Sequence, residues 1–274
     1  MTIEDDFLDK ILHFIKMAGK IAIDCQEHLT ATLKADGSIV TQADLNISKL
    51  FRRRMADYLK TGEHCILDEE DLEPVANFFN GKKKYTWIID PIDGSAPYYQ
   101  GFPLWAVAVA LFRDAKPYMG AIYMPSSRDL VYSDGSASYY AKRAFSSREE
   151  VITLEPRESA PLGKGIVLSR RCCDTSRRDY TVLDLYSNYV MSIYTLTNRS
   201  ICQFFRSSTK LWDMAASMAI ARTMGLCFRN VENGRDFDEI SPELLDEQWA
   251  LNGTYLMCNP RLYGTLRDSG LHRG

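Results

Sequence analysis

The sequence predicts a mixed α+β or α/β protein, built as one large domain or as two lobes that share a cleft. Helical patterns come first along the chain, paired strands follow, and strands and helices then alternate. A chain of 274 residues can bury a large core in either arrangement. We expect an N-terminal α+β lobe over 1–150 and a C-terminal α/β lobe over 151–274. The boundary is placed near 145–160, where Pro156 and Pro161 interrupt the periodicity.

The N-terminal part is predicted to form two amphipathic helices. Residues 44–59 give the second, with apolar residues toward the core and the run Arg52-Arg53-Arg54 toward water. For these arginines a solvated helix face is favoured over a phosphate-binding role. The first helix is predicted from apolar residues that repeat at helical spacing: Phe7, Leu8, Ile11, Leu12, Ile15, Ala18, Ile21, Ala22 and Cys25.

The middle of the chain is predicted to form antiparallel strands. Residues 104–112 are a continuous apolar run, typical of a buried strand, and residues 116–123 are expected to pair with it. Residues 128–144 indicate a further hairpin around Asp134-Gly135, because an Asp-Gly pair suits a tight turn between strands.

Strands and helices are expected to alternate in the C-terminal part. Residues 165–169 and 180–185 are rich in β-branched and leucine residues and are predicted to be strands. One helix is expected to begin at Ser187. Another is expected over 213–224, where Gly225 ends it.

Composition indicates a cytoplasmic protein that binds neither nucleic acid polymers nor membranes. The net charge is −3 and the pI about 5.9, so no general positive field attracts nucleic acid. Apolar runs of about 18 residues, which could span a membrane, are absent, and the acidic N-terminus differs from a signal peptide. The seven cysteines are odd in number and lack a CxxC pair, which indicates reduced thiols. The four histidines show no metal-ligand spacing, which favours oxygen ligands for any metal.

The segment 87–95, Trp-Ile-Ile-Asp-Pro-Ile-Asp-Gly-Ser, carries the strongest indication of a site. Its apolar residues predict the end of a buried strand, which stops at the carboxylate of Asp90. Pro91 cannot continue a sheet ladder, so we expect the backbone to turn there and to bring Asp93 beside Asp90.

The last two residues of this segment suit the binding of an anion. Gly94 lets the backbone approach a ligand closely, and Ser95 supplies a hydroxyl at a predicted helix start. Two carboxylates followed by these residues form a set that binds hard cations together with a phosphate. The segment therefore predicts a metal and phosphate site.

Three other segments have both a structural and a functional interpretation. Residues 67–71, Leu-Asp-Glu-Glu-Asp, fit a solvated acidic loop or a set of metal ligands. Residues 34–44 fit a hairpin followed by a helix cap, since Thr41 and Asp44 have the spacing of a capping box. Residues 210–217 place Asp213 at a helix start, where it could simply be the N-cap, and the small residues after it allow close helix packing.

Taken together, these segments resemble the magnesium-dependent, lithium-sensitive phosphatase superfamily of inositol monophosphatases, 3′(2′),5′-bisphosphate nucleotidases and fructose-1,6-bisphosphatases. The resemblance covers nearly the whole chain in the right order. The matching motifs are K-x-D-G-S-x-V-T-x-A-D at 34–44, the acidic pair Glu69-Glu70, D-P-[IL]-D-G-[ST] at 90–95, the helix start Tyr186-Ser187 and W-D-x-A-A at 212–216.

The chain departs from the superfamily pattern at four positions. Asp68 stands where a glycine usually precedes the acidic pair, and Pro97 replaces a common asparagine. Tyr186 replaces the glycine of the Gly-Ser helix start, and Arg206 lies where inositol-specific members carry a glutamate. None of these changes removes an expected metal ligand.

The resemblance implies a layered αβαβα sugar-phosphatase fold with the metal site where the two lobes meet. It implies that Glu69, Asp90 and the Ile92 carbonyl hold one Mg²⁺, that Asp90, Asp93 and Asp213 hold a second, and that a weaker third ion lies near Glu69. Mg²⁺ prefers such carboxylate and carbonyl oxygens. Without metal, acids packed this closely repel one another, so the empty site should be partly disordered or protonated.

The remaining roles also follow from the resemblance. The backbone N–H groups of Gly94 and Ser95 would receive phosphate oxygens, and Asp44 with Ser95 would orient or deprotonate the attacking water. The implied catalytic residues are Asp44, Glu69, Asp93 and Ser95, the implied substrate-binding residues are Ser187 and Arg206, and further candidates are Lys34, Thr41 and Glu70.

The expected function is therefore that of a Mg²⁺-dependent phosphomonoesterase similar to inositol-1-monophosphatase, in which water attacks a small sugar or polyol phosphate directly. A 3′(2′),5′-bisphosphate nucleotidase is the alternative, and a catalytically inactive relative that only binds metal or phosphate is a third. Competition between Li⁺ and Mg²⁺ is expected. The superfamily's habit predicts a homodimer, weakly supported by the aromatic residues Tyr98, Tyr99, Phe102 and Trp105 after the metal turn.

Overall fold

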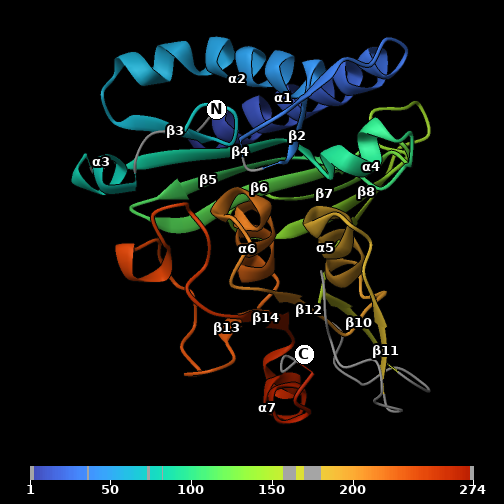
Figure 1. The fold of residues 1–274 in the computed structure, drawn as a ribbon, viewed down its shortest axis with the longest axis vertical. Coiled ribbons are helices and arrows are strands. Elements are labelled where there is room, and N and C mark those ends of the chain that lie inside the picture. The colour runs from blue at the N-terminus through green and yellow to red at the C-terminus, as the bar shows by residue number, and fades with distance from the viewer. Residues whose placement is uncertain are drawn as a thin grey trace.

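The computed structural model describes residues 3–35, 37–72, 75–81, 83–156, 165–169 and 180–271, and its elements stack in layers (Figure 1). Two long helices cover one face of a seven-stranded sheet. Two shorter helices lie between this sheet and a five-stranded sheet, and a last helix lies beyond the second sheet. The α/β fold with layers αβαβα is thus confirmed.

The first layer consists of α1 (Ile3–Gln26) and α2 (Gln42–Lys60), as the helical spacing predicted. The apolar stripes of both helices pack on the sheet. One detail of the prediction was wrong: Arg52 does not simply face water, because its guanidinium pairs with Asp68 and Asp71 at the end of the neighbouring strand. Arg53 and Arg54 are exposed as predicted.

The seven-stranded sheet has the order β3-β4-β5-β6-β7-β8-β9, and α3 (Val75–Asn80) lies between β3 and β4 in the chain. Both predicted hairpins are present, and Gly135 adopts a φ of 90° in the turn of the second. The strands are β3 (His64–Asp68), β4 (Tyr85–Asp93), β5 (Ala106–Arg113), β6 (Lys116–Met124), β7 (Asp129–Ser133), β8 (Ser138–Lys142) and β9 (Glu150–Thr153).

Both faces of this sheet are covered, which explains its continuous apolar strands. Along β4, Trp87 and Ile89 pack toward α1 and α2, whereas Ile88 between them packs toward the opposite layer. Successive side chains of a strand point to opposite faces, so one short run of apolar residues contributes to the hydrophobic core on each face of the sheet.

Strand β4 does not stop at Asp90, which corrects the sequence-based expectation. Between Asp90 and Asp93 it advances three residues while its partner β5 advances two, from Ala108 to Ala106. One extra residue in one strand is a β-bulge, and β3 pairs with β4 only as far as Ile89. Pro91 is tolerated because a bulge beyond the end of a neighbouring strand does not require its missing N–H.

The five-stranded sheet has the order β11-β10-β12-β14-β13. The predicted strands near 165 and 180 are present, although the second ends at Leu183. A two-stranded hairpin, β1 (Ala31–Leu33) and β2 (Ile39–Thr41), stands apart. The remaining strands are β10 (Gly165–Ser169), β11 (Tyr180–Leu183), β12 (Cys202–Phe205), β13 (Cys227–Asn230) and β14 (Tyr255–Cys258).

Helices α5 (Asn188–Leu196) and α6 (Ala215–Thr223) fill the space between the two sheets, and α7 (Tyr263–Asp268) packs on the outer face of the second sheet. The small residues of α6 allow the predicted close packing. A side chain on Gly120 of β6 would lie 2.7 Å from the Ala216 carbonyl oxygen, so α6 and the sheet meet almost backbone to backbone.

Two predictions about this part need comment. Asp213 is not the N-cap of α6, because it ends a separate 3₁₀ turn, Leu211–Asp213, and Met214 precedes α6. The predicted lobe boundary stays a prediction, and Pro161 lies outside the described residues. The first large sheet spans residues 64–153 and the second spans 165–258.

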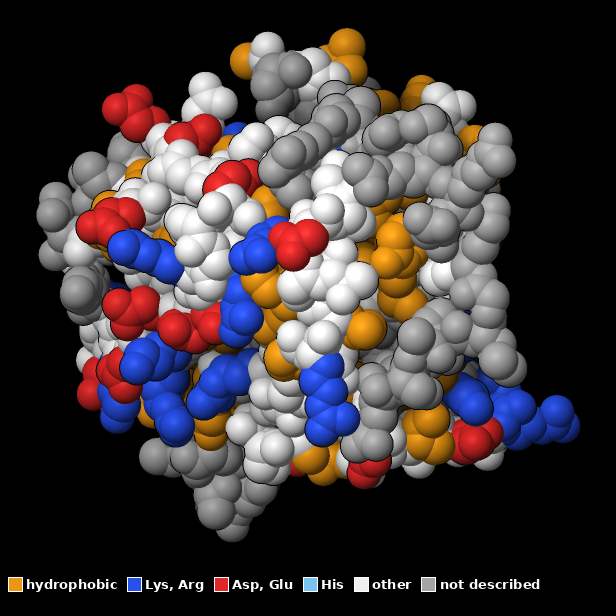
Figure 2. All heavy atoms as spheres, turned by 90° about the horizontal axis from the view of Figure 1, so that it is seen from below, with side chains coloured by type: hydrophobic (Ala, Val, Ile, Leu, Met, Phe, Trp, Pro, Cys, Tyr) orange, Lys and Arg blue, Asp and Glu red, His pale blue; other side chains and the backbone are white. Residues whose placement is uncertain are grey.

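None of the described helices is long and apolar enough to cross a membrane. Seen from below the second sheet, the visible described side chains mix basic and acidic groups side by side (Figure 2). This mixture accords with the small net charge of −3.

Candidate active site

Three acidic residues converge at the bulged end of β4. Asp90, Asp93 and Asp213 each offer a carboxylate oxygen, and these oxygens all lie within 4.8 Å of one another. The bulge brings the first two together, and the 3₁₀ turn before α6 supplies the third. This is the set that the resemblance to the phosphatase superfamily assigned to the second Mg²⁺.

Asp93 is held by the start of α5. Its Oδ2 atom accepts hydrogen bonds from the Ser187 hydroxyl at 2.6 Å and from the Tyr189 backbone N–H at 2.5 Å. Ser187 is fully buried and also caps α5 by accepting a bond from the Val190 N–H at 3.1 Å. In this structure Ser187 orients Asp93, and direct contact between Ser187 and a substrate stays a prediction.

Asp213 is fixed within its own turn and through α5. Its backbone N–H donates to the Lys210 carbonyl at 3.1 Å, and its Oδ2 atom accepts a bond from the Lys210 N–H at 3.2 Å. The Tyr189 hydroxyl donates to the Trp212 carbonyl and accepts from the Ala216 N–H at 3.2 Å. Tyr189 thus touches both Asp93 and the turn of Asp213, a role that sequence reasoning missed.

Asp90 provides the test of whether a cation fits. Both of its carboxylate oxygens are buried, and no donor in the described part of the chain bonds to either one. Burial, followed by the charges of Glu69, Asp93 and Asp213, raises its pKa well above the ordinary value. A buried carboxylate without donors is costly, and a divalent cation bound between Asp90, Asp93 and Asp213 would remove that cost for Asp90. The oxygen ligands that these carboxylates offer therefore fit Mg²⁺.

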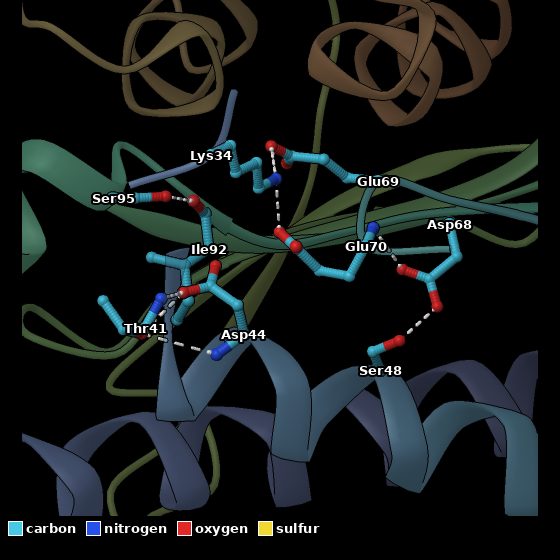
Figure 3. A network of polar contacts seen from close by, with 9 residues as sticks. All are labelled: Lys34, Thr41, Asp44, Ser48, Asp68, Glu69, Glu70, Ile92 and Ser95. Carbon is cyan, nitrogen blue, oxygen red and sulfur yellow. Dashed lines mark hydrogen bonds and ion pairs between the residues drawn. The ribbon is translucent and has the colours of Figure 1, made fainter. Parts of the chain in front are cut away.

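The acidic pair at the end of β3 is bound to a lysine. Lys34 donates to Glu69 at 3.0 Å and to Glu70 at 2.8 Å (Figure 3). Burial lowers the pKa of Lys34, but the two carboxylates outweigh this effect and raise it. Glu69 is not among the three carboxylates that converge most closely, although its charge contributes to the raised pKa of Asp90.

The pair Asp44 and Thr41 forms the predicted capping box of α2. Asp44 Oδ2 accepts bonds from the Thr41 N–H at 2.7 Å and from the Thr41 hydroxyl at 2.5 Å. Asp44 Oδ1 is buried, and no donor in the described residues bonds to it. This oxygen is therefore available to accept a proton or a water hydrogen. Asp36, which belongs to the motif at 34–44, lies outside the described residues.

Ser95 begins the short helix α4 (Ser95–Tyr99), as expected. Its hydroxyl donates to the Ile92 carbonyl at 3.0 Å rather than to Asp44 (Figure 3). Gly94 has a φ of 90°, and a side chain there would lie 2.8 Å from the Leu104 carbonyl oxygen. Only glycine suits both constraints, so the backbone geometry of the turn depends on it.

Asp68, a departure from the superfamily pattern, ties the acidic pair to α2. It is fully buried, accepts a bond from the Ser48 hydroxyl, and accepts another from the Glu70 N–H at 3.1 Å. Arg52 approaches it at 3.5 Å. The sequence marked Asp68 as unusual, but its partners on α2 could not be identified from the sequence.

Arg206 directly follows β12 and is half-buried, with its Nε and Nη2 atoms shielded from solvent. Its carbonyl accepts a bond from the Thr209 N–H at 2.8 Å in the turn that leads to Asp213. The residue thus lies in the segment that connects the second sheet to the carboxylate cluster.

The metal-free protein is expected to lose stability as the pH rises. Burial raises the pKa of Asp44 from 3.8 to about 7 and that of Glu70 from 4.5 to about 6. The folded state then binds more protons than the unfolded state, so the stabilisation is full below about pH 4 and is lost through about pH 7. After EDTA treatment, the Tm should be at least about 3 °C higher at pH 5.5 than at pH 8.

Two further measurements check this expectation. Mg²⁺ should raise the Tm more at about pH 8 than at about pH 5.5, because its ligands must be ionised. Asp44→Asn should reduce the pH dependence of the metal-free protein. A metal-free Tm that is equal or higher at pH 8 would contradict the account.

Known proteins are similar to this chain in both sequence and fold. Residues 9–261 match the model of the inositol monophosphatase family. The Nus factor SuhB of Vibrio cholerae is 26% identical over 235 residues, which cover 79% of this chain and 80% of the relative. The 3′(2′),5′-bisphosphate nucleotidase CysQ of Escherichia coli is 26% identical over 230 residues, which cover 80% of this chain and 88% of the relative.

The fold is also similar to that of a solved IMPase/NADP phosphatase in complex with Mg²⁺ and phosphate. The TM-score is 0.74 at 18% identity, and the match covers 97% of this chain and 95% of the other. The family match extends over almost the whole chain and includes every segment of the carboxylate cluster. The chain belongs to the inositol monophosphatase family.

Proposed function

We propose that the protein is a Mg²⁺-dependent phosphomonoesterase that hydrolyses a small sugar or polyol phosphate, similar to inositol-1-monophosphatase. The observation that carries the proposal is the convergence of Asp90, Asp93 and Asp213, with both oxygens of Asp90 buried and without donors in the described chain. Such a set binds a hard cation and, through it, a phosphate.

The metal ligands that we propose are the carboxylates of Glu69, Asp90, Asp93 and Asp213 and the carbonyl of Ile92. They would hold two Mg²⁺, with a third near Glu69. When bound, these ions would neutralise the phosphate, lower the pKa of a bound water and stabilise the departing alkoxide. Glu69 can take part once its bond to Lys34 is exchanged for the metal.

The chain's own groups would position the water and the phosphate. Asp44 Oδ1, buried without a donor in the described chain, would accept a hydrogen from the attacking water, and the Ser95 hydroxyl would orient that water. The backbone N–H groups of Gly94 and Ser95 would receive phosphate oxygens. Lys34, Thr41 and Glu70 would support these groups, through the bonds already described.

A panel of phosphomonoesters tests the proposal. Phosphate release is measured with Mg²⁺ for inositol 1-phosphate, adenosine 3′,5′-bisphosphate and simpler polyol phosphates. We expect release from at least one ester, suppression by Li⁺ in competition with Mg²⁺, and no covalent phosphoenzyme. Binding of metal and phosphate without release from any ester would instead favour the catalytically inactive alternative.

Arg206 separates the two leading substrate classes. A guanidinium pairs with anions through up to five donors, whereas the glutamate of inositol-specific members accepts bonds from sugar hydroxyls. We therefore expect a preference for a substrate with a second anionic group, or a broad range of sugar phosphates, over plain inositol 1-phosphate. The first case corresponds to the bisphosphate nucleotidase alternative, and CysQ is a relative with that name.

The substitution Arg206→Glu tests this expectation. It should lower kcat/KM for adenosine 3′,5′-bisphosphate by about ten- to a hundredfold relative to inositol 1-phosphate, because a charged hydrogen bond is worth about 1.5–3 kcal/mol. Arg199→Glu, at a residue that contacts Tyr140 and Tyr194 instead, is the matched control. An unchanged ratio between the two substrates would place Arg206 outside the pocket.

Three broader proposals accompany the reaction. We propose a two-lobe division near 145–160, supported by the sequence interval between the first large sheet, which ends at Thr153, and the second, which begins at Gly165. We also propose a cytoplasmic location, supported by the cysteines: none of the five in the described residues forms a disulfide, and Cys172 and Cys173 lie outside them. We also propose a homodimer. Tyr99 and Phe102 are candidate residues of its interface because they are 44% and 58% exposed, whereas Tyr98 and Trp105 are fully buried and belong to the core.

A further inference from the structure

Tyr186 adopts a backbone conformation that an aromatic residue rarely adopts. Its φ is 59°, in the left-handed region, where a side chain crowds the backbone and glycine is favoured. The Tyr186 N–H donates to the Asp184 side chain at 2.8 Å, and this local turn holds the conformation. The resemblance described above places a glycine at this position, so the chain has exchanged an unstrained residue for a strained one.

Packing does not offset this strain within the described chain. Phe145 and Trp249 also have left-handed φ values, but their rings contact Tyr123 at 5.2 Å and Phe78 at 5.0 Å between centroids. Tyr186 is 62% exposed, and its ring has no ring or cation partner among the described residues. Strain that persists without a packing gain marks candidate functional positions.

Tyr186 directly precedes a residue that contacts the carboxylate cluster. Its neighbour Ser187 is fully buried and donates to Asp93 at 2.6 Å. A side chain on Gly94 would lie 3.2 Å from the Ser187 Cβ atom, so the residue after Tyr186 touches the proposed phosphate turn. Tyr186 is thus exposed and directly precedes the residue that holds Asp93 and lies against Gly94.

We propose that Tyr186 is a specificity-determining residue whose ring stacks on a planar ring in the leaving alcohol of the substrate. This inference rests on the proposed phosphatase function. An aromatic side chain offers a flat apolar face that stacks on any planar heterocycle. Glycine at the same position offers no such surface. The substrate class is thus a sugar phosphomonoester whose alcohol carries an aromatic heterocycle, such as a nucleoside.

Two esters that differ mainly in the ring test the inference. Adenosine 2′-monophosphate and glycerol 2-phosphate each carry one phosphate on a secondary alcohol, so neither involves a second anion. The measured quantity is the ratio of their kcat/KM values with Mg²⁺. Tyr186→Leu, which keeps bulk without a ring, and Tyr186→Gly should lower this ratio about tenfold. Tyr186→Phe should keep it within about twofold.

A stability measurement separates the strain from the stacking. Tyr186→Gly should raise the Tm by about 2 °C, because glycine relieves the left-handed backbone. Asn198→Gly, at another left-handed residue at the far end of α5, is the control and should leave the substrate ratio unchanged. A ratio that does not change in Tyr186→Leu would overturn the inference.

The outcomes distinguish this inference from the proposed function. If the unmodified protein hydrolyses both esters and only the ratio fails to respond, Tyr186 has no role and the phosphatase proposal stands. If it hydrolyses neither, the Kd values of the same two esters are compared by calorimetry, and the proposed function fails only if no ester of the panel releases phosphate either. A tenfold weaker binding of the adenosine ester to Tyr186→Leu would then still support stacking, and equal binding would overturn it.

Discussion

Replacement of Asp90, Asp93 or Asp213 by asparagine is expected to lower kcat at least about a hundredfold. Each change removes one charge from a set of carboxylates within 4.8 Å of one another. Loss of a single ligand misplaces the water or leaves the departing alkoxide without stabilisation. Asparagine has nearly the same shape as aspartate, so a loss of kcat reports charge and coordination rather than packing. The measurement is the steady-state rate of phosphate release at saturating substrate and Mg²⁺.

Controls separate this effect from a general loss of folding. Asp236→Asn changes an exposed carboxylate that pairs with Arg229 on the far strand β13 and should leave kcat within about twofold. Metal-free Asp90→Asn should not be less stable than the metal-free protein, because it removes a buried charge without donors in the described chain. Near-normal kcat in all three asparagine variants would refute the metal site.

Substitution of Ser95 by alanine is expected to lower kcat by about a hundredfold and to change KM much less. The hydroxyl is assigned to the attacking water, and general acid–base groups typically contribute about 10²–10⁴ to the rate. A group that acts mainly in the transition state affects kcat more than KM. In the structure the hydroxyl donates to the Ile92 carbonyl at 3.0 Å, so it also orients a proposed metal ligand.

Ser95→Thr is the matched variant, since it retains the hydroxyl and occurs in the superfamily motif. It should keep most of the activity if the hydroxyl is the important group. A tenfold or greater rise in KM for Ser95→Ala, with kcat unchanged, would show that Ser95 only binds substrate. Equal losses in the threonine and alanine variants would indicate a packing effect instead.

Local sequence patterns predicted the helices and hairpins because each depends on residues close together in the chain. The stripe on α1, the Asp-Gly turn before β8 and the capping box at Thr41 and Asp44 all have this character. The bulge in β4 was not predicted. Pro91 correctly indicated an irregularity, but only the neighbouring strands show that the chain continues beyond it.

The site was predictable to the extent that its residues are neighbours in sequence or belong to a known motif. Asp90 and Asp93 are close along the chain, whereas Asp213 could be assigned only through the resemblance. Contacts that depend on tertiary packing were not predictable. The ion pair between Arg52 and Asp68 is one example, because the helical pattern shows which face of α2 is polar but not which residue of another element pairs with it.

Aromatic residues after the metal turn illustrate the same limit. Tyr98 donates to the Ala22 carbonyl on α1 at 2.7 Å, and its ring packs against Trp105. Both residues are part of the core, whereas Tyr99 and Phe102, in the same stretch, are exposed. Composition alone cannot divide such a stretch between core and surface, because all four residues are apolar or amphipathic.

Phosphate release after removal and return of the metal tests the central claim most directly. The protein is treated with EDTA, freed of chelator, and assayed on the best ester of the panel with increasing Mg²⁺. We expect phosphate release to fall at least about a hundredfold in the metal-free protein and to return when Mg²⁺ is added. In Asp90→Asn, added Mg²⁺ should not restore it. Full activity in excess EDTA would contradict the claim that these carboxylates work through a bound metal.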